Sequence, residues 1–282
     1  MYRLWAKNQN KDKIELTGSP YFEVSEIDGL LPEDANISTT NFANADGSKI
    51  NSARIENREM QITIRPQYPI EENRQLLYKY FQMKKATTIY FKNANRDVYI
   101  TGTVKKIDGS LFEQTQTLTI DLLCENPYWQ DKNETKSDMA SVEDLFEFPF
   151  AIAEEGIEFS RINKELTQKI NNLGDIETGM IIELSASGEV VNPTIYNVET
   201  REHFGLKTTM QLGDLIRINT NNLRKKVELI RNGETSNAIN SITKGNKWLK
   251  LEPGENQFTY TCDSGEEYLN VNFTFANMYE GV

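Results

Sequence analysis

The stretch ANADGSKINSARIENREMQITIRP, residues 43–66, changes character at Met60. From Met60 onward apolar residues alternate with polar ones, and this alternation predicts a strand with one buried face. Residues 50–57 offer little to bury, yet they follow the dipeptide Asp46-Gly47, which favours tight hairpin turns. The stretch therefore predicts a long hairpin arm, polar in its far half, that continues into a core strand.

Length and composition describe an ordinary folded protein. The chain has 282 residues, 26% of them charged and 10% aromatic, which is enough for two domains with separate cores. The start, MYRLWAKNQNKDKIEL, has no apolar stretch of signal-peptide length, and no run approaches the roughly 20 apolar residues of a membrane span. We expect a protein made in a cytoplasm, with no membrane partner and with Cys124 and Cys262 as reduced thiols.

The net charge of −11 is unevenly distributed. Residues 1–131 hold 16 Lys and Arg against 18 Asp and Glu, a charge of −2, whereas residues 132–282 hold 15 against 24, a charge of −9. Sequence-specific binding to nucleic acid needs a basic face that neutralises phosphates. The distribution argues against such binding and against an anionic membrane surface as the partner.

The first part of the chain predicts strands around one helix. Residues 69–85 begin with Pro69, carry two glutamates in the first turn and end in two lysines, which suits the helix dipole. Strands are expected over residues 87–92, 97–107 and 114–124. We place this domain at residues 1–131.

The second part predicts a different architecture. Residues 132–145 are polar and aperiodic, which indicates a linker. Residues 146–282 show short alternating runs with turn signals every eight to a dozen residues, among them Asn232-Gly233. This spacing predicts an all-β sandwich or jelly roll.

The residues of catalytic and metal sites are scarce. His203 is the single histidine, so a zinc site built on several histidines is excluded, and no motif for a serine nucleophile or a phosphate loop occurs. Carboxylate doublets such as Glu266-Glu267 point to opposite faces of a strand, unlike the paired acids of a glycosidase. We therefore expect that the protein is not an enzyme and that it has no catalytic residue, cofactor site or metal site.

Trp248 is the candidate for a ligand surface. It precedes the alternating residues Leu249–Glu252 and falls on their polar side. There it either covers an edge of the core or faces outward, where a tryptophan can stack on a sugar. The second alternative would make the sandwich a carbohydrate-binding adhesion module that contacts host cell-wall sugars.

Several motifs together resemble the distal tail protein (Dit) family of siphophages and of prophages in Gram-positive hosts. They occur in family order and are LPEDANISTT (31–40), ADGSKINSARIENRE (45–59), IEENRQLLYKYF (70–81), NRDVYITGTV (95–104) and CENPYW (124–129). The resemblance covers residues 1–131 most specifically. It implies a mainly β protein with a ring-forming, tail-tube-like N-terminal domain and a C-terminal galectin-like sandwich.

The resemblance also implies a function. Family members form a six-membered ring at the end of the tail tube, as a structural hub of the virion tail tip that is assembled in the host cytoplasm. The expected partners are other copies of the chain, the tail tube protein, and a tail-associated lysin, tail fibre or receptor-binding protein. A tail-associated hydrolase is the remaining alternative, and the missing catalytic residues count against it.

The arm would then find its partner on the next subunit. The expected interface residues are Asp46, Gly47, Ser48, Arg54 and Arg58. Arg54 and Arg58 are four residues apart, so on a single strand they would share a face and meet carboxylates of the neighbour. The alternative is a pair of solvated surface charges.

The ring would enclose the path of the DNA. The acidic residues Glu56, Glu59, Asp97, Asp108 and Asp121 lie beside the arm or in and between the expected strands. We expect them to give the pore a neutral to negative potential, so that DNA passes without specific binding. The alternative is that these residues only solubilise the outer surface.

Overall fold

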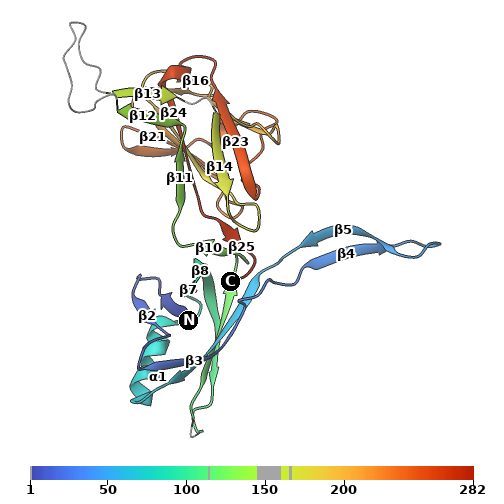
Figure 1. The fold of residues 1–282 in the computed structure, drawn as a ribbon, viewed down its shortest axis with the longest axis vertical. Coiled ribbons are helices and arrows are strands. Elements are labelled where there is room, and N and C mark those ends of the chain that lie inside the picture. Colours follow the sequence, from blue (N-terminus) through green and yellow to red (C-terminus); the bar gives the residue numbers. More distant parts are fainter. Residues whose placement is uncertain (1, 114, 145–159, 165–166) are drawn as a thin grey trace. The chain divides into compact units, whose positions relative to one another are not determined.

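The computed structural model describes residues 2–113, 115–144, 160–164 and 167–282 (Figure 1). The chain divides into two compact units. The first comprises Met1–Lys132 together with Met278–Val282, and the second comprises Asn133–Asn277. The expected start of the sandwich, residue 146, lies outside the described residues.

The first unit is built on one antiparallel sheet of nine strands. Its main path has the order β2-β1-β7-β8-β9-β6-β3, and β10 pairs with both β8 and β25. The strands are β1 (Arg3–Lys7), β2 (Lys13–Glu15), β3 (Phe22–Asp28), β6 (Arg58–Pro66), β7 (Ala86–Lys92), β8 (Asp97–Gly109), β9 (Leu118–Cys124), β10 (Trp129–Asp131) and β25 (Met278–Tyr279).

The core of this unit lies on one face of the sheet. Along β6, Met60, Ile62 and Ile64 are buried and the residues between them are more exposed, which confirms the predicted alternation. Helix α1 (Ile70–Tyr80) places Leu77 against the same core. The helix is shorter than the predicted 69–85 because the backbone leaves the helical region at Phe81, whose side chain turns into the core.

The hairpin arm consists of β4 (Asn36–Asn41) and β5 (Ser48–Arg54), which pair only with each other. Every residue of both strands is exposed. Gly47 at the turn has φ = +98°, a conformation that favours glycine. The predicted hairpin is therefore confirmed, and it projects from the sheet as a two-stranded ribbon (Figure 1).

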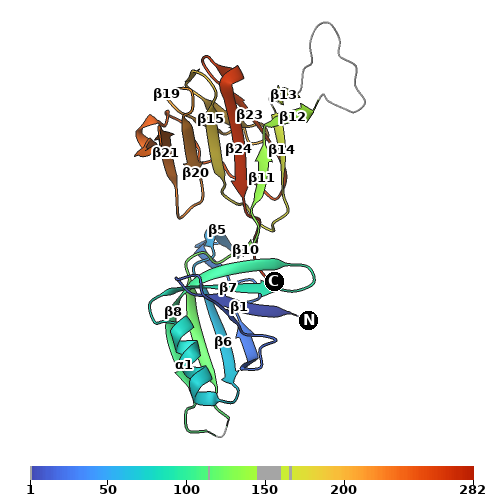
Figure 2. The ribbon, with the colours of Figure 1, turned by 90° about the vertical axis from the view of Figure 1, so that its left-hand side faces the viewer.

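The second unit is a sandwich of two antiparallel sheets (Figure 2). The six-stranded sheet has the order β11 (Thr135–Asp138), β24 (Leu269–Phe275), β15 (Ile181–Ala186), β20 (Leu215–Asn219), β21 (Lys226–Arg231) and β22 (Glu234–Asn237). The four-stranded sheet has the order β14 (Thr167–Asn172), β23 (Gly254–Thr261), β17 (Thr194–Asn197) and β18 (His203–Gly205). Short pairs complete the unit, with two 3-10 turns: β12 (Ala140–Asp144) with β13 (Ser160–Lys164), β16 (Val190–Val191) with β19 (Thr209–Met210), η1 (Ile239–Ser241) and η2 (Glu266–Tyr268).

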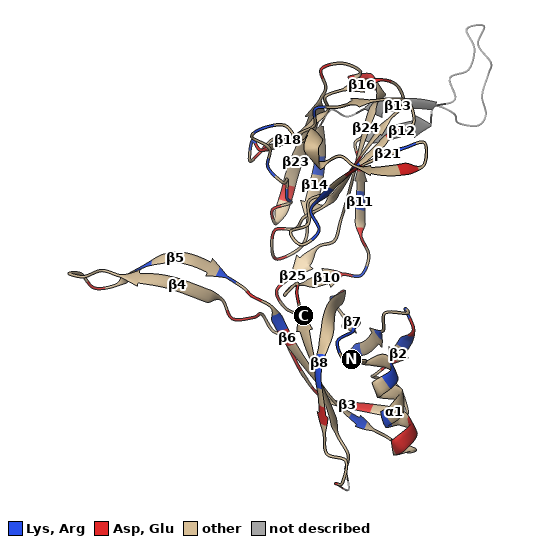
Figure 3. Cartoon of the chain, turned by 180° about the vertical axis from the view of Figure 1, so that it is seen from behind, with Lys and Arg blue, Asp and Glu red and all other residues tan. Residues whose placement is uncertain are grey.

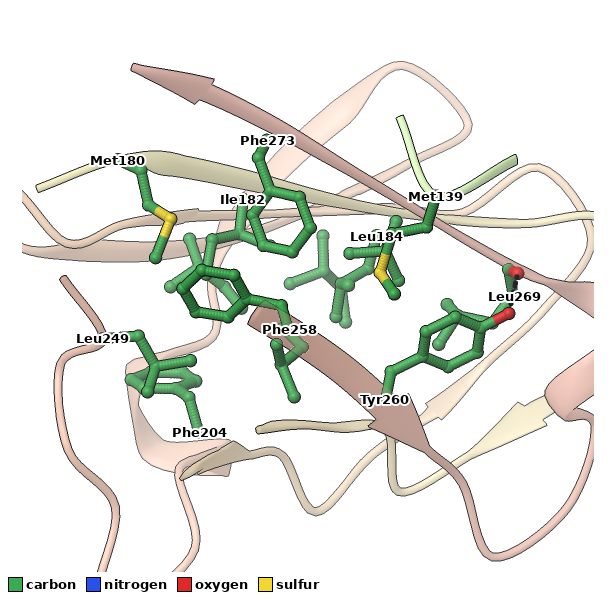
Figure 4. Close-up of a cluster of buried hydrophobic side chains, with 14 of the residues drawn as sticks. Met139, Met180, Ile182, Leu184, Phe204, Leu249, Phe258, Tyr260, Leu269 and Phe273 are labelled. Carbon is green, nitrogen blue, oxygen red and sulfur yellow. Dashed lines mark hydrogen bonds between the residues drawn. The ribbon is translucent and has the colours of Figure 1, made fainter. Parts of the chain in front are cut away.

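Apolar side chains of the two sheets meet in the middle of the sandwich (Figure 4). Phe258 of β23 and Phe273 of β24 face each other with ring centroids 5.1 Å apart. At the turn between β21 and β22, Asn232 and Gly233 have φ of 52° and 81°, as a tight hairpin requires. The mainly β fold with a C-terminal sandwich is as predicted.

Two boundaries differ from the prediction. The expected linker, residues 132–145, contains β11 and β12, and β11 pairs with β24 of the sandwich. The side chains of β11 are mostly exposed, so this strand has no apolar alternation that would predict it. Residues 278–282 were assigned to the sandwich, but they belong to the first unit, where β25 pairs with β10.

Candidate assembly site: the arm and its root

The arm has an apolar face that its own unit does not cover. The pairs Ile37–Ala53 and Thr39–Ile50 place Ile37, Ile50 and Ala53 on the same side of the hairpin. Ile37 is 52% exposed and Ile50 is 61% exposed. An isolated two-stranded hairpin is marginally stable in water, and this one leaves an apolar surface exposed.

The residues Asp46, Gly47 and Ser48 form the tip of the arm. All three are exposed, and Ser48 pairs with Asn41 at the start of β5. A side chain at Gly47 would meet nothing within 4 Å, so this glycine serves the turn and not a close contact within the chain.

Arg54 lies at the root of the arm and stays at the surface. Its side chain is 72% exposed, and its guanidinium contacts the carboxylate of Glu56 at 3.1 Å. The same oxygen of Glu56 accepts a hydrogen bond from the amide of Asn36 at 3.1 Å. These contacts hold the last residue of β5 to the first residue of β4.

The prediction that Arg54 and Arg58 share one face of a single strand is wrong. The two arginines lie on different strands, because residues 55–57 separate β5 from β6. Arg58 begins β6 and points into the first unit, where its side chain is 1% exposed. It is neither a solvated surface charge nor available to a neighbouring subunit.

The guanidinium of Arg58 satisfies four backbone carbonyls. The acceptors are the oxygens of Pro127 at 2.6 Å, Gly29 at 2.5 Å, Leu31 at 2.9 Å and Glu280 at 2.5 Å. These carbonyls come from three segments that are far apart in the sequence: residues 29–31, residue 127 and residue 280. Arg58 therefore ties them together at one point.

The charge of Arg58 is balanced in part. Burial lowers the pKa of the guanidinium, and the nearby carboxylate of Glu33, 3.6 Å from Nε, acts in the opposite direction. A buried arginine with its donors satisfied is stable, whereas a buried cation without partners would be strongly unfavourable.

The position of Arg58 fixes the direction of the arm. Gly29 and Leu31 lie in the segment that leads into β4, and Arg58 itself follows the end of β5. The hydrogen bonds thus join the incoming and the outgoing root of the hairpin. Gly29 has φ = +88°, and a side chain there would lie 2.9 Å from the oxygen of Glu59, so the packing at this root admits only glycine.

The C-terminal segment completes the same root. The amide of Val282 donates to the oxygen of Leu30 at 3.0 Å, and an added side chain at Gly281 would lie 2.9 Å from Pro32. Tyr279 pairs with Trp129 across β25 and β10 and donates a hydrogen bond to Asp131 at 3.1 Å. These contacts make residues 278–282 an integral part of the first unit.

The acidic residues expected at a pore have partners within the chain. Glu59 contacts Lys105 at 2.7 Å, and Asp108 contacts Lys106 at 2.6 Å. Glu56 contacts Arg54 at 3.1 Å and Asp97 contacts Lys92 at 2.9 Å. Asp121 accepts a hydrogen bond from the side-chain amide of Gln61 at 2.9 Å. The outer surface of the sheet is thus patterned with both signs of charge.

Trp248 covers an edge of the sandwich core, which is the first of the two predicted alternatives. Its ring lies 5.1 Å from that of Phe204, and the ammonium of Lys225 lies 5.6 Å from its ring centroid. His203 lies beside Tyr196, with ring centroids 5.7 Å apart. Among the described residues, no group of three or more His, Cys, Asp or Glu is placed to hold a metal ion.

Residues 173–279 match the family model described as "Siphovirus-type tail component, C-terminal domain". A comparison with curated proteins gave no match.

Solved structures match the chain over its whole length. The crystal structure of SPP1 Dit, titled a paradigm of the hub adsorption apparatus in phages that infect Gram-positive hosts, has a TM-score of 0.68 and 12% identity, with 99% of both chains covered. Structures of the phage P2 baseplate in its activated conformation, with Ca and with Sr, have TM-scores of 0.56 and 0.55 and identities of 10% and 11%, with full coverage.

The two comparisons agree. Residues 173–279, nearly all of them in the second unit, match the model of the C-terminal domain of siphovirus-type tail components, and the whole chain has the fold of SPP1 Dit. The resemblance to the distal tail protein family that the sequence motifs indicate is confirmed. In the described part of the chain, no helix has the length and apolar character needed to cross a membrane.

Proposed function

We propose that this chain is the structural hub of a siphophage tail tip, and that six copies close into a ring between the tail tube and the proteins that contact the host. The observation that carries the proposal is the arm, a hairpin whose apolar face is not covered by the described residues of its own unit. The full-length likeness to SPP1 Dit supports the same function.

A ring explains why the arm is built as it is. Heterologous contacts that repeat around an axis close into a ring, and a projecting hairpin that lies on the next copy makes such a contact. Full burial of an exposed isoleucine contributes about 1.5–3 kcal/mol, and docking would add about half of that for Ile37 and Ile50, which are 52% and 61% exposed. The hydrogen bonds of Arg58 hold the root in place, so little conformational freedom is lost when the arm docks.

The proposal includes the partners of a hub. One face of the ring would contact the tail tube protein, and the other a tail-associated lysin, a tail fibre or a receptor-binding protein. The protein would act in the virion tail tip after assembly in the host cytoplasm. DNA would pass through the ring without specific binding, because Glu59, Asp97 and Asp108, each next to a lysine, would leave the pore neutral to negative.

Negative-stain electron microscopy of the purified full-length chain tests this function. The proposal predicts rings with six-fold symmetry that depend on the arm. A chain that stays monomeric at micromolar concentration would refute the ring. The sandwich as a carbohydrate-binding module has less support, because the ring of Trp248 packs against the core and against Lys225.

A further inference from the structure

The segment that leads into the arm is strongly acidic. Residues 22–34, FEVSEIDGLLPED, hold five carboxylates and no lysine or arginine. We call these residues the acidic edge: Glu23, Glu26, Asp28, Glu33 and Asp34. Within the described chain Glu26, Asp28 and Asp34 make no ion pair or hydrogen bond through their side chains, and all three are exposed.

The acidic edge lies on a free margin of the sheet. Strand β3 carries its first three residues and pairs only with β6. Charged side chains on an edge strand discourage unspecific pairing with other strands. They also give this margin a definite sign for a specific partner.

The other free margin of the sheet is basic. Strand β2 pairs only with β1, and six cations lie on or beside these strands. We call them the basic patch: Arg3, Lys7, Lys11, Lys13, Lys92 and Lys132. Three carboxylates, Asp12, Glu15 and Asp97, lie among them, so the patch has a charge of +3 in a part of the chain whose total is −2.

Aromatic rings hold part of the basic patch in position. Trp5 of β1 and Tyr90 of β7 stack with centroids 5.3 Å apart and an interplanar angle of 4°. The ammonium of Lys13 lies 5.2 Å from the centroid of Trp5, and that of Lys7 lies 5.2 Å from the centroid of Tyr90. Cations held over aromatic faces lose less freedom when a carboxylate approaches.

The two margins are the two ends of the strand order of the sheet, with β2 at one end and β3 at the other. Figure 1 and Figure 3 both show the arm leaving on the side away from β2, and the acidic edge runs into the root of that arm. In a ring built by heterologous contacts, one flank of a copy meets the opposite flank of the next. The arm and the acidic edge therefore approach the neighbour from the same side.

We propose that the acidic edge of one copy docks on the basic patch of the next copy. This inference rests on the ring proposed above and names the surfaces that close it. The complementary charges orient the two copies before the arm settles on its neighbour. They also set the direction of assembly, because two acidic edges or two basic patches repel each other.

Charge reversal tests the inference in the full-length chain. The first variant carries Glu26→Lys and Asp28→Lys, and the second carries Lys7→Glu and Lys11→Glu. None of these side chains forms an ion pair within the described chain, so both variants should fold. We expect each variant alone to lower the fraction of ring at least tenfold at about 150 mM salt, a concentration at which contacts across roughly 8 Å or less still act.

The decisive result comes from combination. When the two variants are mixed, each reversed surface meets its complement, and alternating rings should recover. The chain with all four substitutions should also recover rings of its own. The control Glu199→Lys with Glu234→Lys makes the same change in net charge as the first variant, on exposed residues of the second unit, and should leave the ring intact.

The outcomes separate this inference from the function on which it rests. If the unaltered chain forms rings and both reversals form them equally well, the docking surfaces are elsewhere and the ring stands. If each reversal abolishes the ring but neither mixing nor the fourfold variant restores it, the two surfaces do not contact each other. If the unaltered chain forms no ring, the proposed function fails first.

Discussion

Arg58 and Glu280 lie 222 residues apart in the chain, and the guanidinium of Arg58 donates a hydrogen bond of 2.5 Å to the backbone oxygen of Glu280. The same side chain binds the oxygens of Gly29 and Leu31 at the root of the arm. One buried cation therefore links the end of the chain to the segment that would contact a neighbouring copy. The stability of the first unit and the direction of the arm both depend on the guanidinium of Arg58.

Replacement of Arg58 should destabilise the first unit. Arg58→Ala leaves four carbonyls without their donor and is expected to lower the free energy of unfolding by about 3–5 kcal/mol. Arg58→Lys should also destabilise, because an ammonium cannot reach acceptors arranged around a planar guanidinium. Urea unfolding monitored by hydrogen exchange of peptides from residues 22–66 measures the loss.

The control for this prediction is Arg54→Ala, which removes an exposed ion pair and should change the free energy of unfolding by about 0.2–1 kcal/mol. Equal effects at the two positions, or a stable Arg58→Lys variant, would show that the buried hydrogen bonds do not hold the root.

The last five residues should be required by the first unit. A chain that ends at Asn277 loses β25, uncovers Trp129 and removes the backbone oxygen of Glu280, which is one of the four acceptors of Arg58. Faster amide exchange is expected in β10 and in residues 29–33, with the sandwich unaffected. Tyr279→Phe keeps the aromatic side chain and loses only the hydrogen bond to Asp131. We expect it to lower the free energy of unfolding by about 1 kcal/mol.

If residues 29–33 exchange their amide hydrogens at the same rate in the truncated and the intact chain, residues 278–282 do not stabilise the first unit.

The sandwich should lose stability in acid through Asp214. The side chain of Asp214 is 2% exposed, and the hydrogen bonds from Arg231, chiefly, and from the amide of Gln211 lower the pKa of its carboxyl group. Because the folded pKa lies below the unfolded value of about 3.9, this contribution is present above that value and is lost as the pH falls through the folded pKa.

Asp214→Asn tests the sign of this effect. At pH 7 the variant should be less stable by about 1.5–3 kcal/mol, near the lower limit because Arg231 is 39% exposed. The difference should shrink as the pH falls below about 3.9. Hydrogen exchange of peptides from residues 209–231 measures the difference in stability between the two chains at each pH. A difference that stays constant between pH 7 and pH 2 would show that the charge of Asp214 is not its cause.

Much of the fold follows from the sequence, and the reasons are local. The alternation from Met60 predicts β6, the dipeptide Asp46-Gly47 predicts the turn of the arm, and Asn232-Gly233 predicts the turn between β21 and β22. Each of these signals acts through backbone preferences over a few residues. The arm and the sandwich could be predicted for that reason.

The burial of Arg58 can be predicted from the sequence, although the motifs place it at the surface. Counting back by two residues from Met60 places Arg58 on the buried face of the same strand. Arginine is rarely buried without a partner, and the spacing from Arg54 suggested a surface pair instead. The acceptors of Arg58 are backbone oxygens from distant segments, and no side-chain pattern announces them.

The return of the C-terminus and the strands inside the expected linker had no sequence signal. Residues 278–282 and β11 pair through their backbones, and most of β11 is exposed. Backbone pairing is independent of side-chain type, so polar segments can add to a sheet without alternation. Such boundaries depend on tertiary structure.

The mass of the protein in solution tests the central claim most directly. Light scattering during gel filtration should give about 194 kDa for the full-length chain, which is six times 32.4 kDa. Replacement of residues 37–53 by a short Gly-Ser turn removes the apolar face of the arm and leaves Arg54, Glu56 and Arg58 in place. The account predicts a folded protein with the mass of a single chain for that variant, and a ring that persists without the arm would contradict it.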